Sequence, residues 1–130
     1  MLKRIYYHDT DCGGVVYYGN YLKYLEEART ELFERCGYSV KRMMDEGYMF
    51  VVARQEVEYK HPAFYDDVLD IETTVSAVSE ISVEFTYKIT NQNGKLTTKA
   101  KTVLVCVGRD IKPRSIPPQV REKLKPAAIA

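Results

Sequence analysis

The chain has 130 residues, of which 45% are hydrophobic, and its 19 basic and 18 acidic side chains give a formal net charge of +1. This size fits one domain, predicted over residues 1–130, and is too small for two well-formed cores. The balanced charge argues against a nucleic-acid partner, and no segment has the apolar length of a signal peptide or membrane span, so we expect a cytoplasmic protein without membrane insertion.

The first predicted elements are a strand over residues 4–8 and a long amphipathic helix over residues 20–36. Apolar residues recur along that helix at helical spacing, and charged residues share its other face. Asn20 is the expected N-cap, and Gly37 is the expected residue after the C-cap. Ser39 to Glu46 is predicted to form a second, short helix with Ser39 as its cap.

After Gly47 the apolar pattern changes to alternation, which is typical of strands with one buried face. Strands are predicted over residues 51–60, 69–77, 81–90 and 95–107, with a turn at 91–94, and a last short helix over 119–124. In the first of these strands, Val51, Ala53, Val57 and Tyr59 are expected to face the core. These four strands are predicted to form an antiparallel meander that follows the first strand and the long helix. The helix covers the apolar face of the sheet, so an α+β fold is predicted.

Cysteine and histidine are too sparse for a metal site. Cys12, Cys36 and Cys106 are odd in number and widely spaced, and there are only two histidines. This pattern is typical of reduced thiols, so neither disulfides nor a metal ion nor another cofactor is expected. Cys12 is interpreted as a small buried residue rather than a nucleophile, because no histidine is placed to activate it.

The segment between the first strand and the long helix carries the chemistry. It places two carboxylates, Asp9 and Asp11, and the pair Gly13-Gly14 before a helix N-terminus. The unpaired N–H groups of a helix N-terminus can stabilise an oxyanion while a nearby carboxylate acts as base or nucleophile. These are the components of an acyl-transfer site.

The same segment resembles the signature of the hot-dog-fold acyl-CoA thioesterases, in the 4-hydroxybenzoyl-CoA thioesterase and YbgC-like (Tol-Pal-associated) branch. The matching positions are Asp9, Asp11, Gly14, Val16, Tyr17 and Tyr21, followed by Glu26, Ala28 and Arg29. Residues 62–73 also look like this family's segment that leads into its third strand. The resemblance covers most of the chain.

The resemblance implies a hot-dog fold, in which a bent sheet of about five strands wraps around the helix, and hydrolysis of an acyl-CoA thioester. Asp11 would be the nucleophile or general base, and backbone N–H groups around Tyr18 would polarise the carbonyl. Gly14 is either close-approach backbone in substrate binding or a plain turn glycine. Subunits of this family join sheets edge to edge as a homodimer, with active sites at the interface, and often pair again as a homotetramer.

Several residues have ordinary structural interpretations. Asp11 can simply form the turn before two glycines. His8 is a secondary candidate base, and His61 is expected to be a loop residue. Glu26 and Arg29 are three residues apart on the helix and are expected to have a structural or interface role, for example as a side-chain pair.

One feature departs from a well-known branch of the family, which binds coenzyme A phosphates with a basic cluster before the fourth strand. This chain has Ser79-Glu80-Ile81 there. The cations that would replace the cluster stay unranked: Arg54, Lys60, Arg109, Lys112 and Arg114.

Three other functions fit parts of the sequence. An acyl-carrier-protein thioesterase would act on the same thioester, although no basic surface is evident. A hot-dog dehydratase would need a catalytic histidine, for which neither histidine has a suitable context. A non-catalytic acyl-CoA-binding protein would not need Asp11.

Overall fold

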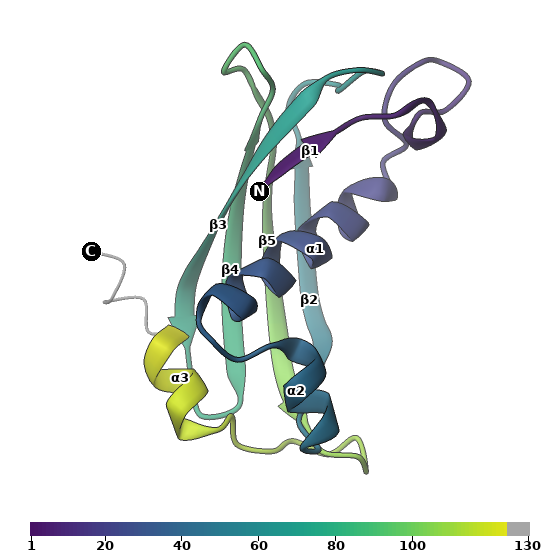
Figure 1. Cartoon of the computed structure of the whole chain (residues 1–130). Helices are drawn as coiled ribbons and strands as arrows, with labels where there is room; N and C mark the ends of the chain where they lie inside the picture. Colours follow the sequence, from purple (N-terminus) through teal and green to yellow (C-terminus); the bar gives the residue numbers. More distant parts are fainter. Residues whose placement is uncertain (125–130) are drawn as a thin grey trace.

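The computed structural model describes residues 1–124, and the last six residues of the predicted 1–130 domain lie outside this range. Five strands form one antiparallel sheet in the order β1-β3-β4-β5-β2 (Figure 1). The strands are β1 (Leu2–Arg4), β2 (Met49–Tyr59), β3 (Val68–Val78), β4 (Ser82–Thr90) and β5 (Leu96–Val107). The helices are α1 (Asn20–Arg35), α2 (Val40–Asp45) and α3 (Pro118–Leu124), with a 3-10 turn, η1, at Tyr7–Asp9.

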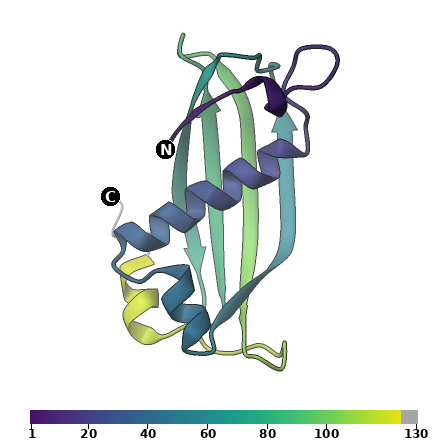
Figure 2. The same ribbon diagram turned by 45° about the vertical axis from the view of Figure 1, so that its right-hand side comes forward.

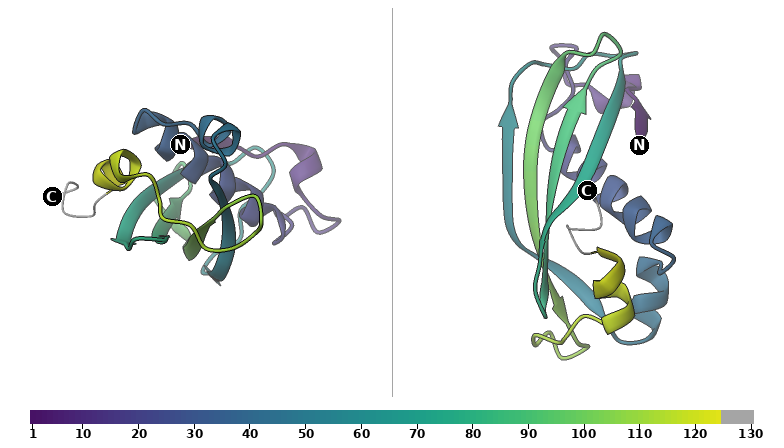
Figure 3. Two further views of the ribbon diagram at one scale, coloured as in Figure 1. Left: turned by 90° about the horizontal axis from the view of Figure 1, so that it is seen from below. Right: turned by 90° about the vertical axis from the view of Figure 1, so that its left-hand side faces the viewer.

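The long helix α1 runs diagonally across one face of the curved sheet, and α2 and α3 lie on the same side of the sheet (Figures 2 and 3). On α1, the side chains of Leu25, Ala28 and Phe33 are buried. The Phe33 ring contacts the Phe85 ring on β4, with centroids 5.7 Å apart. The predicted hot-dog arrangement of a bent antiparallel sheet around one long helix is therefore confirmed.

The alternation predicted for the central strands is also confirmed. On β4, four successive inward positions are buried, namely Val83, Phe85, Tyr87 and Ile89, and polar residues alternate with them. The opposite face of the sheet carries the polar residues. Burial on one face of each strand is what closes the core under α1.

The predicted meander is wrong at β2. This strand does not pair with β3, which follows it in the chain; it pairs with β5, from Met49 opposite Val107 to Tyr59 opposite Thr98. β2 is thus an edge strand, and Val51, Val52 and Tyr59 are 39%, 51% and 52% exposed in the single chain. The segment 60–67 carries the chain from this edge to β3, so only β3, β4 and β5 form a meander.

The predicted first strand, residues 4–8, is wrong in its bounds. The strand ends at Arg4, and Tyr7–Asp9 forms a 3-10 turn instead. The Asp9 carboxylate accepts a hydrogen bond from the Tyr6 N–H at 2.8 Å, and the Asp9 N–H donates to the Tyr6 carbonyl at 3.0 Å. These two bonds close the turn and end the extended backbone, a local competition that alternation does not reveal.

The helix end signals have mixed outcomes. Gly37 follows the C-cap of α1 with φ of +85°, and Ser39 caps α2 by accepting the Arg42 N–H at 3.1 Å, as predicted. Gly19, rather than Asn20, is the N-cap of α1. Within residues 1–124 no helix combines the length and the apolar character that crossing a membrane requires.

Candidate active site

The loop between η1 and α1, residues 10–19, folds into a small hairpin. The Asp11 N–H donates to the Val15 carbonyl at 2.9 Å, and the Gly14 N–H donates to the Asp11 carbonyl at 3.0 Å. The Val16 N–H in turn donates to the Ala63 carbonyl at 2.8 Å, and Val15 bridges Phe64. The hairpin that carries Asp11 is therefore held against the 60–67 segment.

The Asp11 carboxylate is exposed. Its Oδ1 accepts a hydrogen bond from the Gly13 N–H at 2.8 Å, and Oδ2 has no hydrogen-bond partner among residues 1–124. The turn-forming interpretation of Asp11 thus holds for one oxygen. The second oxygen is available to react with a substrate.

Gly14 has a positive φ of +80°, and no atom lies within 4 Å of the position where a Cβ would stand. The left-handed backbone accounts for glycine here without any close neighbour in the single chain. The turn interpretation therefore explains this residue in the isolated subunit.

The N-terminus of α1 borders a pocket. The backbone N–H groups of Tyr18 and Gly19 donate to no acceptor in the described part of the chain, and each lies just before the first helical residue, Asn20. Tyr18 and neighbouring residues enclose a cavity of about 260 Å³, here called the Tyr18 pocket. Its lining is Val15, Val16, Tyr18, Tyr21, Tyr59, Lys60, His61 and Pro62.

Three tyrosines form one wall of the Tyr18 pocket. The Tyr21 and Tyr59 rings meet edge to face, with centroids 5.4 Å apart, and the Tyr59 hydroxyl lies 3.4 Å from the Tyr18 carbonyl oxygen. Burial raises the pKa of Tyr21, and it also raises that of Tyr59. Both hydroxyls therefore stay protonated at neutral pH and can act as hydrogen-bond donors.

Of the sequence-predicted residues, Tyr18 lines this pocket directly, while Asp11 lies opposite Val15, another lining residue, in the hairpin. His8 does not line it; its exposed ring stacks on Tyr6, with Nε2 3.8 Å from Asp9 Oδ1. His61, expected only as a loop residue, does line the pocket. Its position before Pro62 indicated a loop but not a pocket, because the packing of residues 60–67 against the hairpin places it there.

The expectation for Cys12 differs from the structure, and so does the possible side-chain pair of Glu26 and Arg29, whose structural or interface role stays a prediction. Cys12 is exposed rather than buried, because the hairpin projects its tip into solvent. Glu26 and Arg29 form no ion pair within the described residues, and instead line a second cavity of about 310 Å³ between α1, α2 and β2. Apolar side chains dominate this cavity, which we call the apolar cavity: Phe33, Val40, Met44, Met49, Phe50, Val51, Val52, Leu104, Val107 and Ile111.

The cations considered for coenzyme A do not lie together, and Arg54 is on β2 with its Nη2 3.3 Å from Glu56. Arg109 and Arg114 donate to the carbonyls of Asp45 and Gly47 near the C-terminal end of α2, at 3.0 and 2.9 Å, and the Arg114 guanidinium lies 3.9 Å from the Tyr48 ring centroid. Lys60 alone among the five lines the Tyr18 pocket, where its Nζ lies 2.9 Å from Glu58.

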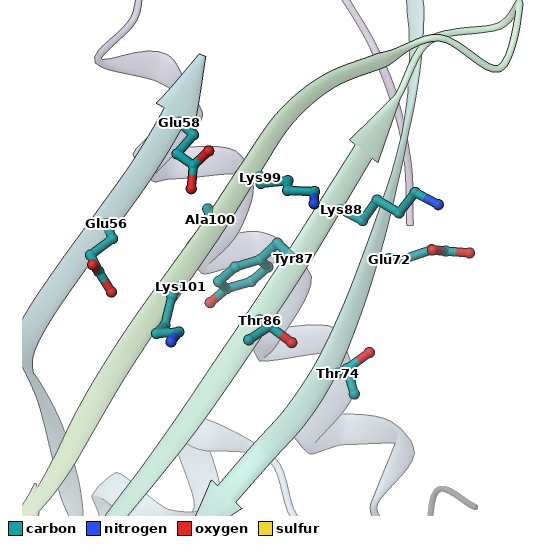
Figure 4. Close-up of a pocket in the computed structure, with 10 residues that line it drawn as sticks. All are labelled: Glu56, Glu58, Glu72, Thr74, Thr86, Tyr87, Lys88, Lys99, Ala100 and Lys101. Carbon is teal, nitrogen blue, oxygen red and sulfur yellow. The ribbon is translucent and has the colours of Figure 1, made fainter. Parts of the chain in front are cut away.

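A larger hollow of about 480 Å³ lies on the outer face of the sheet (Figure 4). It is open, and most of its lining residues are charged. Acidic residues lie on β2 and β3, and lysines lie between them on β4 and β5: Glu56, Glu58, Glu72, Lys88, Lys99 and Lys101. None of Asp11, Gly14 or Tyr18 contributes to it. The sequence-predicted residues therefore lie at or before the N-terminus of α1, and not on this face.

Comparison with known proteins gives matches that extend over almost the whole chain. A family model described as the thioesterase-like superfamily matches residues 6–124. The acyl-CoA thioester hydrolase YbgC of Escherichia coli O6:H1 is 39% identical over 123 residues, covering 94% of this chain and 92% of that protein.

Two crystal structures are similar over nearly the whole chain. A hypothetical protein from Aquifex aeolicus superposes with a TM-score of 0.91 at 34% identity, covering 96% of this chain and 98% of that one. A DHNA-CoA thioesterase from Staphylococcus aureus superposes with a TM-score of 0.86 at 32% identity, covering 88% of this chain and 78% of that one.

Proposed function

The chain belongs to the thioesterase-like superfamily and is an acyl-CoA thioester hydrolase, and we propose that Asp11 and the N-terminus of α1 carry its chemistry. The observation that supports this assignment is the hairpin geometry. The Asp11 N–H donates to the carbonyl of Val15, which lines the Tyr18 pocket, and the N–H groups of Tyr18 and Gly19 follow at the helix N-terminus.

The thioester carbonyl is proposed to bind in the Tyr18 pocket with its oxygen toward the Tyr18 and Gly19 N–H groups. Their hydrogen bonds, together with the positive end of the helix dipole, stabilise the negative charge that develops on this oxygen. The Tyr18 ring is not required for this task, because the donors belong to the backbone.

Asp11 can act by either of two routes. In one, its free carboxylate oxygen attacks the carbonyl carbon, coenzyme A leaves as the thiolate, and water hydrolyses the resulting mixed anhydride. In the other, the carboxylate removes a proton from water, and this water attacks the carbonyl directly. Both routes yield the carboxylic acid and the free thiol, and both need the Asp11 carboxylate ionised.

We also propose that two copies pair through β2. This edge strand has eleven residues, and its outer edge exposes backbone N–H and C=O groups together with Val51, Val52 and Tyr59. A long, partly apolar edge is a template for another strand. A second copy can cover it by antiparallel pairing about a two-fold axis, giving a homodimer that can pair again as a homotetramer.

Such pairing has a consequence for the acyl group. In two identical antiparallel strands, the start of one lies beside the end of the other. The apolar cavity of one copy, at Met49 to Val52, would then adjoin the Tyr18 pocket of the other, at Tyr59. The acyl group is proposed to occupy this shared apolar space. The cytoplasmic location expected from the sequence stays a prediction.

Release of free thiol from a panel of aliphatic and aromatic acyl-CoA esters tests the assignment, with Asp11→Asn as the variant and Asp110→Asn as its matched control. Asp110 is also an exposed loop aspartate. Its Oδ1 accepts a hydrogen bond from the backbone N–H of Lys112, two residues later, at 3.1 Å. Asparagine keeps the turn-forming oxygen at both sites and removes the charge.

We expect Asp11→Asn to lower kcat by about 100-fold or more, the usual size of a lost acid, base or nucleophile, and Asp110→Asn to leave it unchanged. Equal rates in wild type and Asp11→Asn would contradict the role of Asp11. Saturable binding of acyl-CoA by the wild type without thiol release would instead favour a non-catalytic binding protein.

A further inference from the structure

Asp9 is the buried member of an otherwise exposed segment. Its exposure is 6%, whereas Tyr7, His8 and Asp11 are exposed. A buried carboxylate is costly unless hydrogen bonds satisfy it. Its Oδ2 accepts the Tyr6 N–H, and burial together with the nearby Asp9 carboxylate raises the pKa of Tyr24. Asp9 is thus held by its hydrogen bonds with the backbone of Tyr6, which lies outside the 10–19 loop.

The backbone carbonyl of Asp9 connects the two ends of this loop. Its oxygen accepts the Tyr17 N–H at 3.0 Å and the side-chain Nδ2 of Asn20 at 2.8 Å. Asp9 precedes the hairpin that carries Asp11, and Tyr17 and Asn20 flank Tyr18 and Gly19. We call these two hydrogen bonds the clasp. The Asp9 carbonyl oxygen therefore links the start of the hairpin to residues on both sides of the proposed oxyanion donors.

Asn20 does not use its side chain for the helix that it begins. An asparagine at a helix start usually accepts a hydrogen bond from a backbone N–H of the first turn. Here Gly19 is the N-cap, no side-chain cap bond is present at this end of α1, and the Asn20 amide points back to the loop. The side chain thus serves the geometry of the loop rather than that of the helix.

We infer that Asn20 is a positioning residue for Asp11, holding the hairpin in register with the N-terminus of α1 through the Asp9 carbonyl. This inference rests on the proposed function of Asp11. The hairpin tip contains Gly13 and Gly14, which restrain its backbone little, so the clasp adds to the restraint that the contact of Val16 with Ala63 supplies. A displacement of about 1 Å between reacting groups can lower the rate by as much as about 100-fold.

Three substitutions at Asn20 test the inference. Asn20→Leu keeps the size and removes the donor, Asn20→Ser is too short to reach Asp9 and suits a helix start, and Asn20→Gln keeps an amide donor. We expect the first two to lower kcat by about 10-fold to 100-fold with little change in KM, and Asn20→Gln to recover part of the loss. Thermal unfolding checks that each variant is folded. If Asn20→Leu does not fold, Asn20→Ser provides the test.

Asn91→Leu is the matched control. The Asn91 side chain also closes a loop, by accepting the N–H groups of Asn93 and Lys95 in the β4–β5 turn. The control should lose stability and keep its kcat, which separates loss of a loop contact in general from loss of the clasp.

The double variant Asp11→Asn, Asn20→Leu shows whether Asn20 acts through Asp11. If it does, Asn20→Leu lowers the residual rate of Asp11→Asn much less than it lowers the wild-type rate. Equal losses in both backgrounds, or a wild-type kcat in folded Asn20→Leu and Asn20→Ser, would overturn the inference. A wild-type protein that releases no thiol would instead contradict the proposed function itself, so the two failures are distinguishable.

Discussion

Gly14 and Gly94 have the same backbone conformation in two different turns. Their φ angles are +80° and +77°, and at neither residue does any atom lie within 4 Å of a Cβ position. Gly14 is in the hairpin that carries Asp11, whereas Gly94 closes the turn between β4 and β5. An alanine at either position meets no clash and experiences only the strain of a left-handed backbone.

Alanine substitutions at these two glycines distinguish the effect of backbone strain on stability from an effect on catalysis. We expect Gly14→Ala and Gly94→Ala each to lower the free energy of unfolding by about 1 kcal/mol. Only Gly14→Ala should also lower kcat for thiol release, because its strain is relieved by movement of the hairpin beside Asp11. Urea unfolding and thiol-release kinetics on both variants provide the measurement. Equal kcat values for the two would show that the hairpin tolerates movement.

The Tyr18 side chain offers a test of the backbone oxyanion site. Its ring is 64% exposed and lies 4.7 Å from the Tyr17 ring, between centroids. Because the proposed donor is the backbone N–H, Tyr18→Phe should keep kcat within about twofold of wild type, like an ordinary surface substitution. Tyr17→Phe is the control on the adjacent ring. A loss of about 100-fold confined to Tyr18→Phe would show that the hydroxyl takes part in proton transfer.

The β2 edge is the proposed subunit contact. Val52 is 51% exposed on this edge, and Leu2 is 71% exposed on β1, the opposite edge of the sheet. A lysine placed on an edge discourages strand pairing. We expect Val52→Lys to shift the protein from dimer toward monomer and to lower kcat with it, and Leu2→Lys to change neither. Sedimentation velocity at several concentrations measures the oligomeric state. An unchanged dimer in Val52→Lys would contradict pairing through β2.

A carboxylate remote from the site links stability to pH. The Tyr38 hydroxyl donates to Glu46, and this hydrogen bond, with help from Arg42, lowers the pKa of Glu46 below its ordinary value of 4.5. A lowered folded-state pKa contributes stability that is complete above the unfolded-state value and is lost as the pH falls through the folded-state value.

Tyr38→Phe should therefore be less stable than wild type at pH 7, and the difference should shrink as the pH falls below 4.5. Urea unfolding between pH 7 and pH 3 measures it. Glu46→Gln removes the titrating group, so in that background the effect of Tyr38→Phe should not vary with pH. A constant difference for the single Tyr38→Phe variant would exclude this linkage.

Local signals predicted most of the elements. The helical spacing of Leu25, Ala28 and Phe33 identified the buried side of α1, and alternation identified the inward residues of β4 such as Phe85. Gly37 and Ser39 marked the boundary between α1 and α2. These signals lie within one or two turns of chain, where propensity and period act directly.

The errors arose where strand pairing or side-chain hydrogen bonds decide, because the apolar pattern of the sequence carries neither. The pairing of β2 with β5 depends on which strand fills each place in the sheet, so alternation predicted a buried face for a strand that the single chain leaves half open. The bounds of the first strand failed because the Asp9 carboxylate closes a turn with Tyr6. His61 is a loop residue, as expected, and its place in the Tyr18 pocket depends on the packing of the 60–67 segment on the hairpin.

The sequence by itself determined the α+β class and the order of elements, and it predicted the segment from Asp9 to Tyr21 as the place of the chemistry, because period and motif are local properties of a chain. Only the tertiary structure decided how Asp11, the helix N-terminus and the Tyr18 pocket lie relative to one another. That geometry depends on hydrogen bonds such as those to the Asp9 carbonyl and on the return of residues 60–67, and these contacts join residues that are not neighbours in the sequence.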